Sequence, residues 1–130
     1  MSYTLEVQPD PPVIVVTYEG TIDASELGEA QQAIAQTAQK MGMNRVFCIQ
    51  DIRKSRISFL DGMTNLKEFM FAQRKNRSAD VQVRIIFVGM DSVGKAFMQM
   101  MPMAPKGRYR VGAVDTMDEA MEMVRRELVP

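Results

Sequence analysis

The segment FVGMDSVGKAF, residues 87–97, has the spacing of a loop that binds nucleotide phosphates. Gly89 is followed by four residues and then by Gly94 and Lys95, which gives the pattern G-x-x-x-x-G-K. In such loops, backbone N–H groups at a helix start surround the phosphates, and the lysine reaches the terminal ones. A Ser or Thr after the lysine binds magnesium. These residues therefore raise the possibility of nucleotide hydrolysis.

Two features of the motif argue against that activity. Ala96 follows Lys95, so the hydroxyl that would bind magnesium is missing. The chain after Lys95 has room for one strand and one helix, too little for a second acidic motif and for elements that bind a base. We interpret the motif as a chance match, with an anion bound by Ser92 and the amides of the next helix start as a weaker alternative.

Three carboxylates lie at the C-terminal ends of predicted strands, where ligands bind in α/β proteins. Asp51, Asp91 and Asp115 either converge on one rim of the sheet or each cap the helix that follows, and the capping preference of aspartate favours the second interpretation. The alternative function of the chain is a small-ligand binder, for an anionic or apolar ligand, with a pocket near residues 89–93. Its candidate residues are Asp51, Gly89, Asp91, Ser92 and Lys95.

Other catalytic chemistry has little support in the sequence. The chain has no histidine, which removes the commonest general base and the commonest metal ligand. Its one cysteine, Cys48, falls inside the apolar segment RVFCIQDI, and a buried cysteine is usually unreactive. We therefore predict a protein that is not an enzyme and that uses no metal or cofactor.

Basic residues gather after the strand that carries Cys48. Arg53, Lys54 and Arg56 are predicted to form a basic loop, and Lys67, Arg74, Lys75 and Arg77 continue the series. Such a group is either a solvated face or a surface for an acidic protein partner or a phosphorylated ligand. The 16 basic and 16 acidic residues of the chain balance, so we expect no general affinity for nucleic acid.

Methionine is frequent, with 13 residues in the chain. Met98, Met100, Met101 and Met103 lie in the segment MQMMPMAP. Flexible thioethers fill irregular cores and also line adaptable surfaces. The cluster is therefore core filling, a pocket for an apolar ligand or a homodimer contact.

Hydrophobic patterning predicts the elements that must position these residues. Tyr3, Leu5 and Val7 alternate with polar residues, as in an edge strand, and VIVVTY indicates a central strand covered on both faces. The remaining predicted strands are 45–52, 81–89 and 109–115, and the predicted helices are 24–41, 59–76, 92–101 and 117–128.

Capping and packing residues support the first and last helices. Asp23 or Thr21 caps the helix that Gly42 ends, and its buried face is Leu27, Ala30, Ile34, Ala38 and Met41. Thr116 or Asp115 caps the last helix, with Asp118 or Glu119 as the acid of the capping box. Its packing residues are Met117, Ala120, Met121, Val124 and Leu128.

The element order β-β-α-β-α-β-α-β-α predicts an α/β fold. Alternating strands and helices with short connections form a mixed, mostly parallel five-stranded sheet, here in a single domain over residues 1–130. No apolar run approaches a membrane span and the first residues do not resemble a signal peptide, so we expect a cytoplasmic protein without membrane contact.

The segment DIRKSRISFLDGM, residues 51–63, resembles the strand-to-helix junction of the STAS family, the anti-anti-sigma-factor-like domains. There Asp-Leu-Ser is followed, after several residues, by Asp-Ser-Ser-Gly-Leu. Asp51 and Ile52 match the first part, and residues 59–63 match the second. The segment VIVVTYEGTIDASEL and the element order are also similar, above all to the SpoIIAA-like group of uncharacterised bacterial proteins.

This resemblance implies a non-enzymatic regulatory domain that acts through a protein partner. In the family a serine at the junction is phosphorylated, but Asp61 stands at that position here, so the phosphorylation switch is not expected. Asp61 is then either a constitutive anionic docking point or a first-turn residue favoured by the helix dipole. The expected partner-binding residues are Arg53, Lys54, Arg56, Ser58, Asp61 and Gly62.

Overall fold

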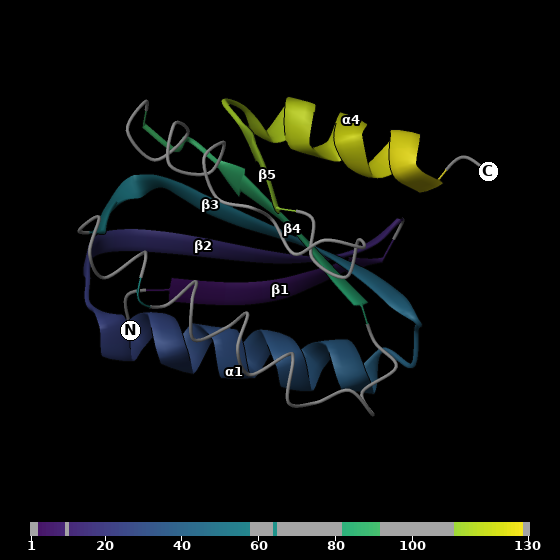
Figure 1. Cartoon of the computed structure of the whole chain (residues 1–130), viewed down its shortest axis with the longest axis horizontal. Coiled ribbons are helices and arrows are strands. Elements are labelled where there is room, and N and C mark those ends of the chain that lie inside the picture. Colours follow the sequence, from purple (N-terminus) through teal and green to yellow (C-terminus); the bar gives the residue numbers. More distant parts are fainter. Residues whose placement is uncertain (1–2, 10, 58–63, 65–81, 92–110, 129–130) are drawn as a thin grey trace.

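A five-stranded sheet with a helix on each face forms the part of the protein that this computed structural model describes (Figure 1). The described residues are 3–9, 11–57, 64, 82–91 and 111–128. The sheet order follows the sequence, and its strands are β1 (Tyr3–Pro9), β2 (Pro12–Ile22), β3 (Arg45–Ile57), β4 (Gln82–Val88) and β5 (Val111–Val114). The β1–β2 pair is antiparallel and every later pair is parallel, so the predicted mixed, mostly parallel sheet is confirmed.

Strands β1 and β2 differ in burial as their sequence patterns predict: alternating polarity indicates an edge strand, and a continuous apolar run indicates a central strand. Strand β1 is an edge strand in which half-buried and exposed residues alternate as far as Glu6, but the predicted alternation fails at Val7, which is 44% exposed. Strand β2 lies between β1 and β3, and its residues 13–16 are buried on both faces. The predictions of an edge strand and a covered central strand are therefore confirmed.

Helix α1 (Ala24–Lys40) begins and ends at the residues that its capping pattern predicts. The N–H of Glu26 donates to the Asp23 Oδ1 at 2.8 Å, which makes Asp23 the N-cap. Gly42 follows the helix with φ of +66°, and its N–H donates to the Gln39 carbonyl. The predicted apolar face of Leu27, Ala30, Ile34 and Ala38 is buried, and Met41 packs against it.

Helix α4 (Met117–Leu128) has the predicted bounds, and Thr116 is its cap. The Thr116 Oγ1 accepts from the Glu119 N–H at 3.1 Å, and Glu119 is the acid of the capping box. Ala120 and Val124 are buried. The prediction that Leu128 packs inward is wrong: it is 47% exposed, because the helix ends there, beyond the last turn that covers the sheet.

The two helices cover opposite faces of the sheet (Figure 1). On the α1 face, Ile14, Val16, Val46, Cys48 and Ile85 pack against Ile34 and its helical neighbours. On the α4 face, Val13, Val15, Phe47, Ile49 and Ile86 pack against Ala120 and Val124. Alternate residues of each central strand thus enter different cores, which explains why these strands are apolar throughout.

Strands β2 and β3 are longer than predicted, and the predicted loop 53–58 is wrong over residues 53–57. β2 continues to Ile22 and β3 to Ile57, and residues 19–22 of β2 pair with residues 54–57 of β3. We call this part the β2–β3 extension. Polar residues can form it because the ladder satisfies their backbone groups while most of their side chains stay exposed.

The predicted helices 59–76 and 92–101 lie outside the described residues, apart from residue 64, which is helical. The full element order and the single-domain assignment therefore stay predictions. No helix within the described ranges is long and apolar enough to cross a membrane.

Candidate functional site

Asp51 lies at the carboxyl end of the sheet, where β3 stops pairing with β4. It is opposite Thr17 of β2 and Val88 of β4, and only 9% of the residue is exposed. Its carboxylate accepts three hydrogen bonds from Arg53: from the backbone N–H at 3.1 Å, from Nε at 2.9 Å and from Nη2 at 2.8 Å. Asp51 and Arg53 thus form a bidentate ion pair at this end of the sheet.

An irregularity in β3 makes this contact possible. Thr17 pairs with Asp51 and Glu19 with Lys54, so β3 has one more residue than β2 between these positions. Such a bulge re-aims side chains locally, and here it lets Arg53 turn back onto a carboxylate two residues away. The Ser55 hydroxyl donates to the Ile52 carbonyl at 2.9 Å across the bulge. The sequence gives no signal for the extra residue.

Gly89 completes the same corner from the end of β4. Its φ of +88° lies in the region that favours glycine, and a Cβ placed there would overlap the Arg53 Cγ and lie 3.2 Å from the Arg53 Cα. Its N–H donates to the Val114 carbonyl at 2.9 Å. That amide is already bonded, so it cannot surround a phosphate, and a packing role explains the first glycine of the G-x-x-x-x-G-K motif.

The electrostatics of the Asp51–Arg53 pair oppose acid–base catalysis by Asp51. Hydrogen bonds from Arg53 outweigh partial burial and lower the pKa of the Asp51 carboxyl below its usual value, with a further contribution from Lys54. The same contact raises the pKa of the Arg53 guanidinium. Both groups therefore stay charged near neutral pH. Asp51 caps no helix, so that interpretation is wrong for this residue, because β3 continues past it.

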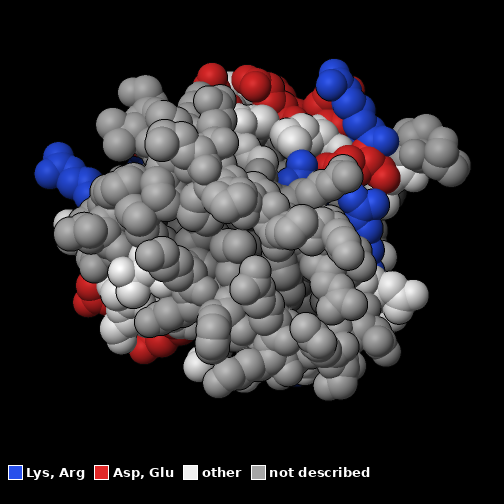
Figure 2. Space-filling model, in the orientation of Figure 1, with Lys and Arg blue, Asp and Glu red and all other residues white. Residues whose placement is uncertain are grey.

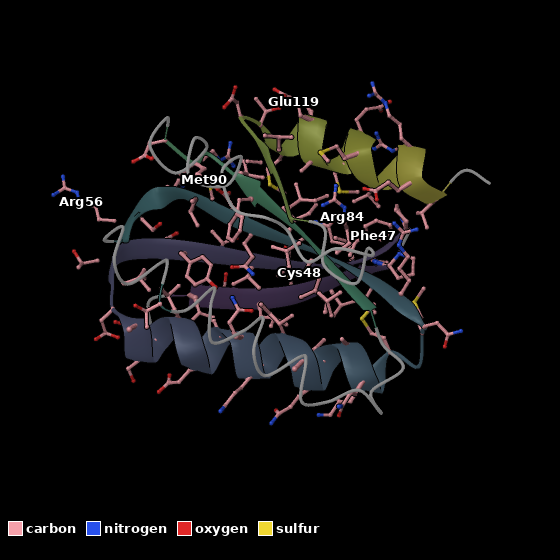
Figure 3. The ribbon with its side chains drawn as sticks, viewed as in Figure 1. Phe47, Cys48, Arg56, Arg84, Met90 and Glu119 are labelled. Carbon is pink, nitrogen blue, oxygen red and sulfur yellow. The ribbon has the colours of Figure 1, made fainter. Side chains whose placement is uncertain are left out.

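The β2–β3 extension carries the basic residues outward from this corner. Lys54 lies opposite Glu19, and Arg56 lies opposite Thr21. Lys54 and Arg56 are exposed, and the Arg53 side chain is 46% exposed. Arg56 projects away from the sheet at the end of the molecule (Figure 3). In Figure 2, basic side chains appear both at this end and along α4, where acidic ones lie beside them.

Asp91 and Asp115 follow β4 and β5 and are exposed. Each takes part in an interaction. Asp115 precedes Thr116, which is the residue that caps α4. Within the described residues, no three His, Cys, Asp or Glu side chains come together as a metal site would require. The prediction that Asp91 and Asp115 cap the helices that follow them therefore stays a prediction.

Cys48 and two polar neighbours lie in the α1 core. Cys48 is fully buried, as predicted, and burial raises the pKa of its thiol to about 12. The buried Tyr18 hydroxyl donates to the Gln50 Oε1 at 3.0 Å, and burial raises the pKa of Tyr18 as well. The sequence predicts none of this pairing, because Gln50 occupies an interior strand position with apolar neighbours.

A second set of charges ties α4 to the opposite end of the sheet. Arg84 Nε lies 3.0 Å from the Glu127 Oε2, and Arg45 Nη2 lies 2.8 Å from the Glu127 Oε1. The Arg45 guanidinium also lies over the Phe47 ring, 5.1 Å from its centroid. We assign this group to stability, since it joins a helix end to two strand starts.

The structure thus brings together some of the candidate residues and leaves others outside the description. Asp51, Arg53 and Gly89 are in contact, and Lys54 and Arg56 extend from the same strand. Ser58, Asp61, Gly62, Ser92, Lys95 and the Met98–Met103 cluster lie outside the described residues. The small-ligand pocket and the homodimer contact therefore stay predictions.

Comparison with known proteins identifies the fold. No family model matches the chain, and no curated protein matches it. A solved structure of the anti-sigma factor antagonist SpoIIAA in its unphosphorylated form superposes with a TM-score of 0.60, at 16% identity, over 95% of this chain and 97% of that one. The protein has the SpoIIAA-like fold.

A second structure agrees with this assignment. An uncharacterised protein of the DUF3478 family from Shewanella loihica PV-4, itself described as having a SpoIIAA-like fold, superposes with a TM-score of 0.59 at 8% identity. The match covers 94% of this chain and 93% of that one. The expected STAS or SpoIIAA-like architecture is thereby confirmed. In this SpoIIAA-like chain, the Asp51–Arg53 corner lies within residues 51–63, the segment whose sequence resembles the STAS junction.

Proposed function

We propose that this protein is a regulatory domain without enzymatic activity that acts by binding a protein partner. The SpoIIAA-like fold supports the proposal, since the solved relative is an anti-sigma factor antagonist. The described residues that could do chemistry also favour it. Cys48 is a buried thiol, and Asp51 is held as a carboxylate by Arg53.

The observation that carries the proposal is the β2–β3 extension. It places Lys54 and Arg56 on a paired strand at the carboxyl end of the sheet, and Arg53 lies in the bulge directly before it; all three residues are exposed. Groups on a rigid strand lose less conformational freedom on binding than groups on a loop, which favours a docking role over a merely solvated face. In the sequence, Ser58, Asp61 and Gly62 follow directly, and we include them in the proposed docking surface.

Regulation through phosphorylation of the junction serine is not part of this proposal. Asp61 stands where the STAS family has that serine, and an aspartate carries a permanent negative charge and lacks the hydroxyl that forms a stable phosphate ester.

Affinity capture with matched variants tests the docking surface. Wild-type protein, the triple variant Arg53→Gln/Lys54→Gln/Arg56→Gln, and the control Arg125→Gln/Arg126→Gln would each be incubated with extract of the source cells. Arg125 and Arg126 are also exposed but lie on α4. The proposal expects a protein captured by wild type and by the α4 control but not by the triple variant, and the same pattern with the purified partner. Equal capture by all three would discard the surface.

A further inference from the structure

Arg53 is an exposed cation whose guanidinium is held in one orientation by a single carboxylate. Its backbone N–H, its Nε and its Nη2 all donate to the Asp51 carboxylate. Its stem packs against Gly89, where a side chain would collide with it. A long side chain usually loses rotamer freedom when it binds a ligand, but the Arg53 side chain is already ordered in the folded protein, so binding costs less entropy.

The bonds to Asp51 use one edge of the guanidinium and leave the other. Arginine has five N–H donors in a planar fork, and the contact with Asp51 occupies the edge formed by Nε and Nη2. The end formed by Nη1 and Nη2 keeps donors spaced to match two oxygens of a carboxylate or phosphate. Nη1 donates to none of the described residues, and the Arg53 side chain is 46% exposed.

The surrounding charges favour one direction of approach. Lys54 and Arg56 lie farther along β3, in the β2–β3 extension. An anion is therefore attracted over the extension. Glu19, opposite Lys54, reduces but does not cancel the positive charge of the extension.

We propose that Arg53 is an oxyanion receptor, oriented by Asp51, which binds a phosphate or carboxylate group of the partner end-on over the β2–β3 extension. This inference rests on the proposed docking function and names its chemistry. Asp51 acts as a positioning residue: it fixes the fork and does not touch the anion. Lys54 and Arg56 supply longer-range attraction.

Two model peptides and a free ion provide the test. The probes are inorganic phosphate and two pentapeptides, Gly-Gly-X-Gly-Gly with blocked ends, in which X is phosphoserine or glutamate. The readout is the Nε–Hε resonance of Arg53 in ¹⁵N-labelled protein, assigned by its loss in Arg53→Lys. Shifts with inorganic phosphate and the phosphoserine peptide would identify a phosphate receptor, and shifts with the glutamate peptide a carboxylate receptor. Either supports the proposal, and no shift with any probe overturns it.

The variant Asp51→Asn separates an oriented arginine from a simple positive patch. The substitution makes the corner more positive, so a patch that attracts anions by charge alone would bind more tightly. If Arg53 is an oriented receptor, Asp51→Asn weakens the hydrogen bonds that hold its guanidinium, and the anion should bind roughly tenfold more weakly. Arg53→Lys keeps the positive charge but lacks the planar guanidinium, and it should weaken binding by a similar factor. Tighter binding by Asp51→Asn would show that Asp51 merely masks Arg53 and would overturn the proposal.

Arg126 is the matched control for these measurements. It also pairs with a carboxylate, through one hydrogen bond from Nε to the Glu122 Oε1 at 3.3 Å, but it lies on α4 and is 76% exposed. Its Nε–Hε resonance should not move with any probe, and Arg126→Lys should bind as wild type does. Thermal unfolding of each variant confirms that it is folded. Capture of a partner that needs Lys54 and Arg56 but tolerates Arg53→Lys would leave the docking function intact while rejecting the receptor.

Discussion

Gly89 and Arg53 pack so closely that position 89 has no room for a side chain. A Cβ at Gly89 would overlap the Arg53 Cγ and lie 3.2 Å from both the Arg53 Cα and Cβ, and φ at Gly89 is +88°. One glycine thus closes β4, bonds to β5 through the Val114 carbonyl, and supports the arginine that holds Asp51. The corner is a single packed unit made from three strands.

Gly89→Ala should therefore destabilise the protein by about 2–4 kcal/mol, from backbone strain and from the collision with Arg53. Chemical denaturation of wild type and variant measures the difference. Gly28→Ala is the control, because Gly28 lies in α1 and a Cβ there meets no described atom within 4 Å. That change should stabilise by about 0.5–1 kcal/mol through helix propensity. Equal effects of the two substitutions would contradict the packing described for the corner.

The Asp51–Arg53 pair should make stability depend on pH in the acid range. Because the pKa of Asp51 is lowered in the folded protein, its contribution is present above the unfolded-state pKa of about 3.9 and is lost as the pH falls through the folded value. Denaturation midpoints of wild type and Asp51→Asn should differ by a constant amount above pH 5 and converge below pH 4. A difference that is the same at pH 3 and pH 7 would show that the ion pair does not stabilise the fold.

Removing one partner of the Arg84–Glu127 ion pair should lower stability by a different amount from removing the other. The Arg84 side chain is 11% exposed, and its Nη1 is buried without a hydrogen-bond partner among the described residues. Glu127→Ala would leave this cation without its carboxylate and should cost about 2–4 kcal/mol. Arg84→Met removes the buried charge and keeps much of the packing against α4, so it should cost less. Denaturation of both variants measures the order.

Arg45, the more exposed partner of Glu127, serves as a control for the Arg84–Glu127 ion pair. Arg45 also contacts Glu127, but its side chain is 44% exposed, so Arg45→Met should change stability by under about 1 kcal/mol. A larger loss for Arg84→Met than for Glu127→Ala would mean that the pair itself, and not the avoidance of an isolated buried charge, stabilises α4.

The sequence predicts the parts of this molecule in which local pattern and burial agree. Asp23 and Thr116 cap their helices as expected, and Ala120 and Val124 follow from the helical period. The end of β3 could not be predicted, because residues 53–56 are polar and their strand conformation depends on pairing with β2. Contacts set by the extra residue in β3, such as Arg53 on Asp51, likewise depend on register.

Gln50 and Glu127 show that side-chain pairs between distant parts of the sequence are equally hard to predict. Gln50 accepts from Tyr18, 32 positions earlier in the chain, and Glu127 binds Arg84 from 43 positions away. At these separations along the chain, no local sequence pattern indicates that the two residues of either pair are in contact. Among the candidate site residues, the sequence could place Gly89 directly after β4, but it could not predict that β3 continues past Asp51, nor the contact of each residue with Arg53.

Cys48 provides a test of the α1 core through its reactivity. Burial raises the pKa of this thiol to about 12, so the native protein should react with a thiol reagent such as DTNB only when it unfolds. Addition of denaturant should release one equivalent of reactive thiol, at a rate that follows unfolding. The raised pKa also means that its contribution to stability is present below the unfolded-state value near 9 and is lost as the pH rises from there toward 12. Cys48→Ala should lack this alkaline loss, and rapid labelling of the native protein at pH 8 would contradict the burial of Cys48.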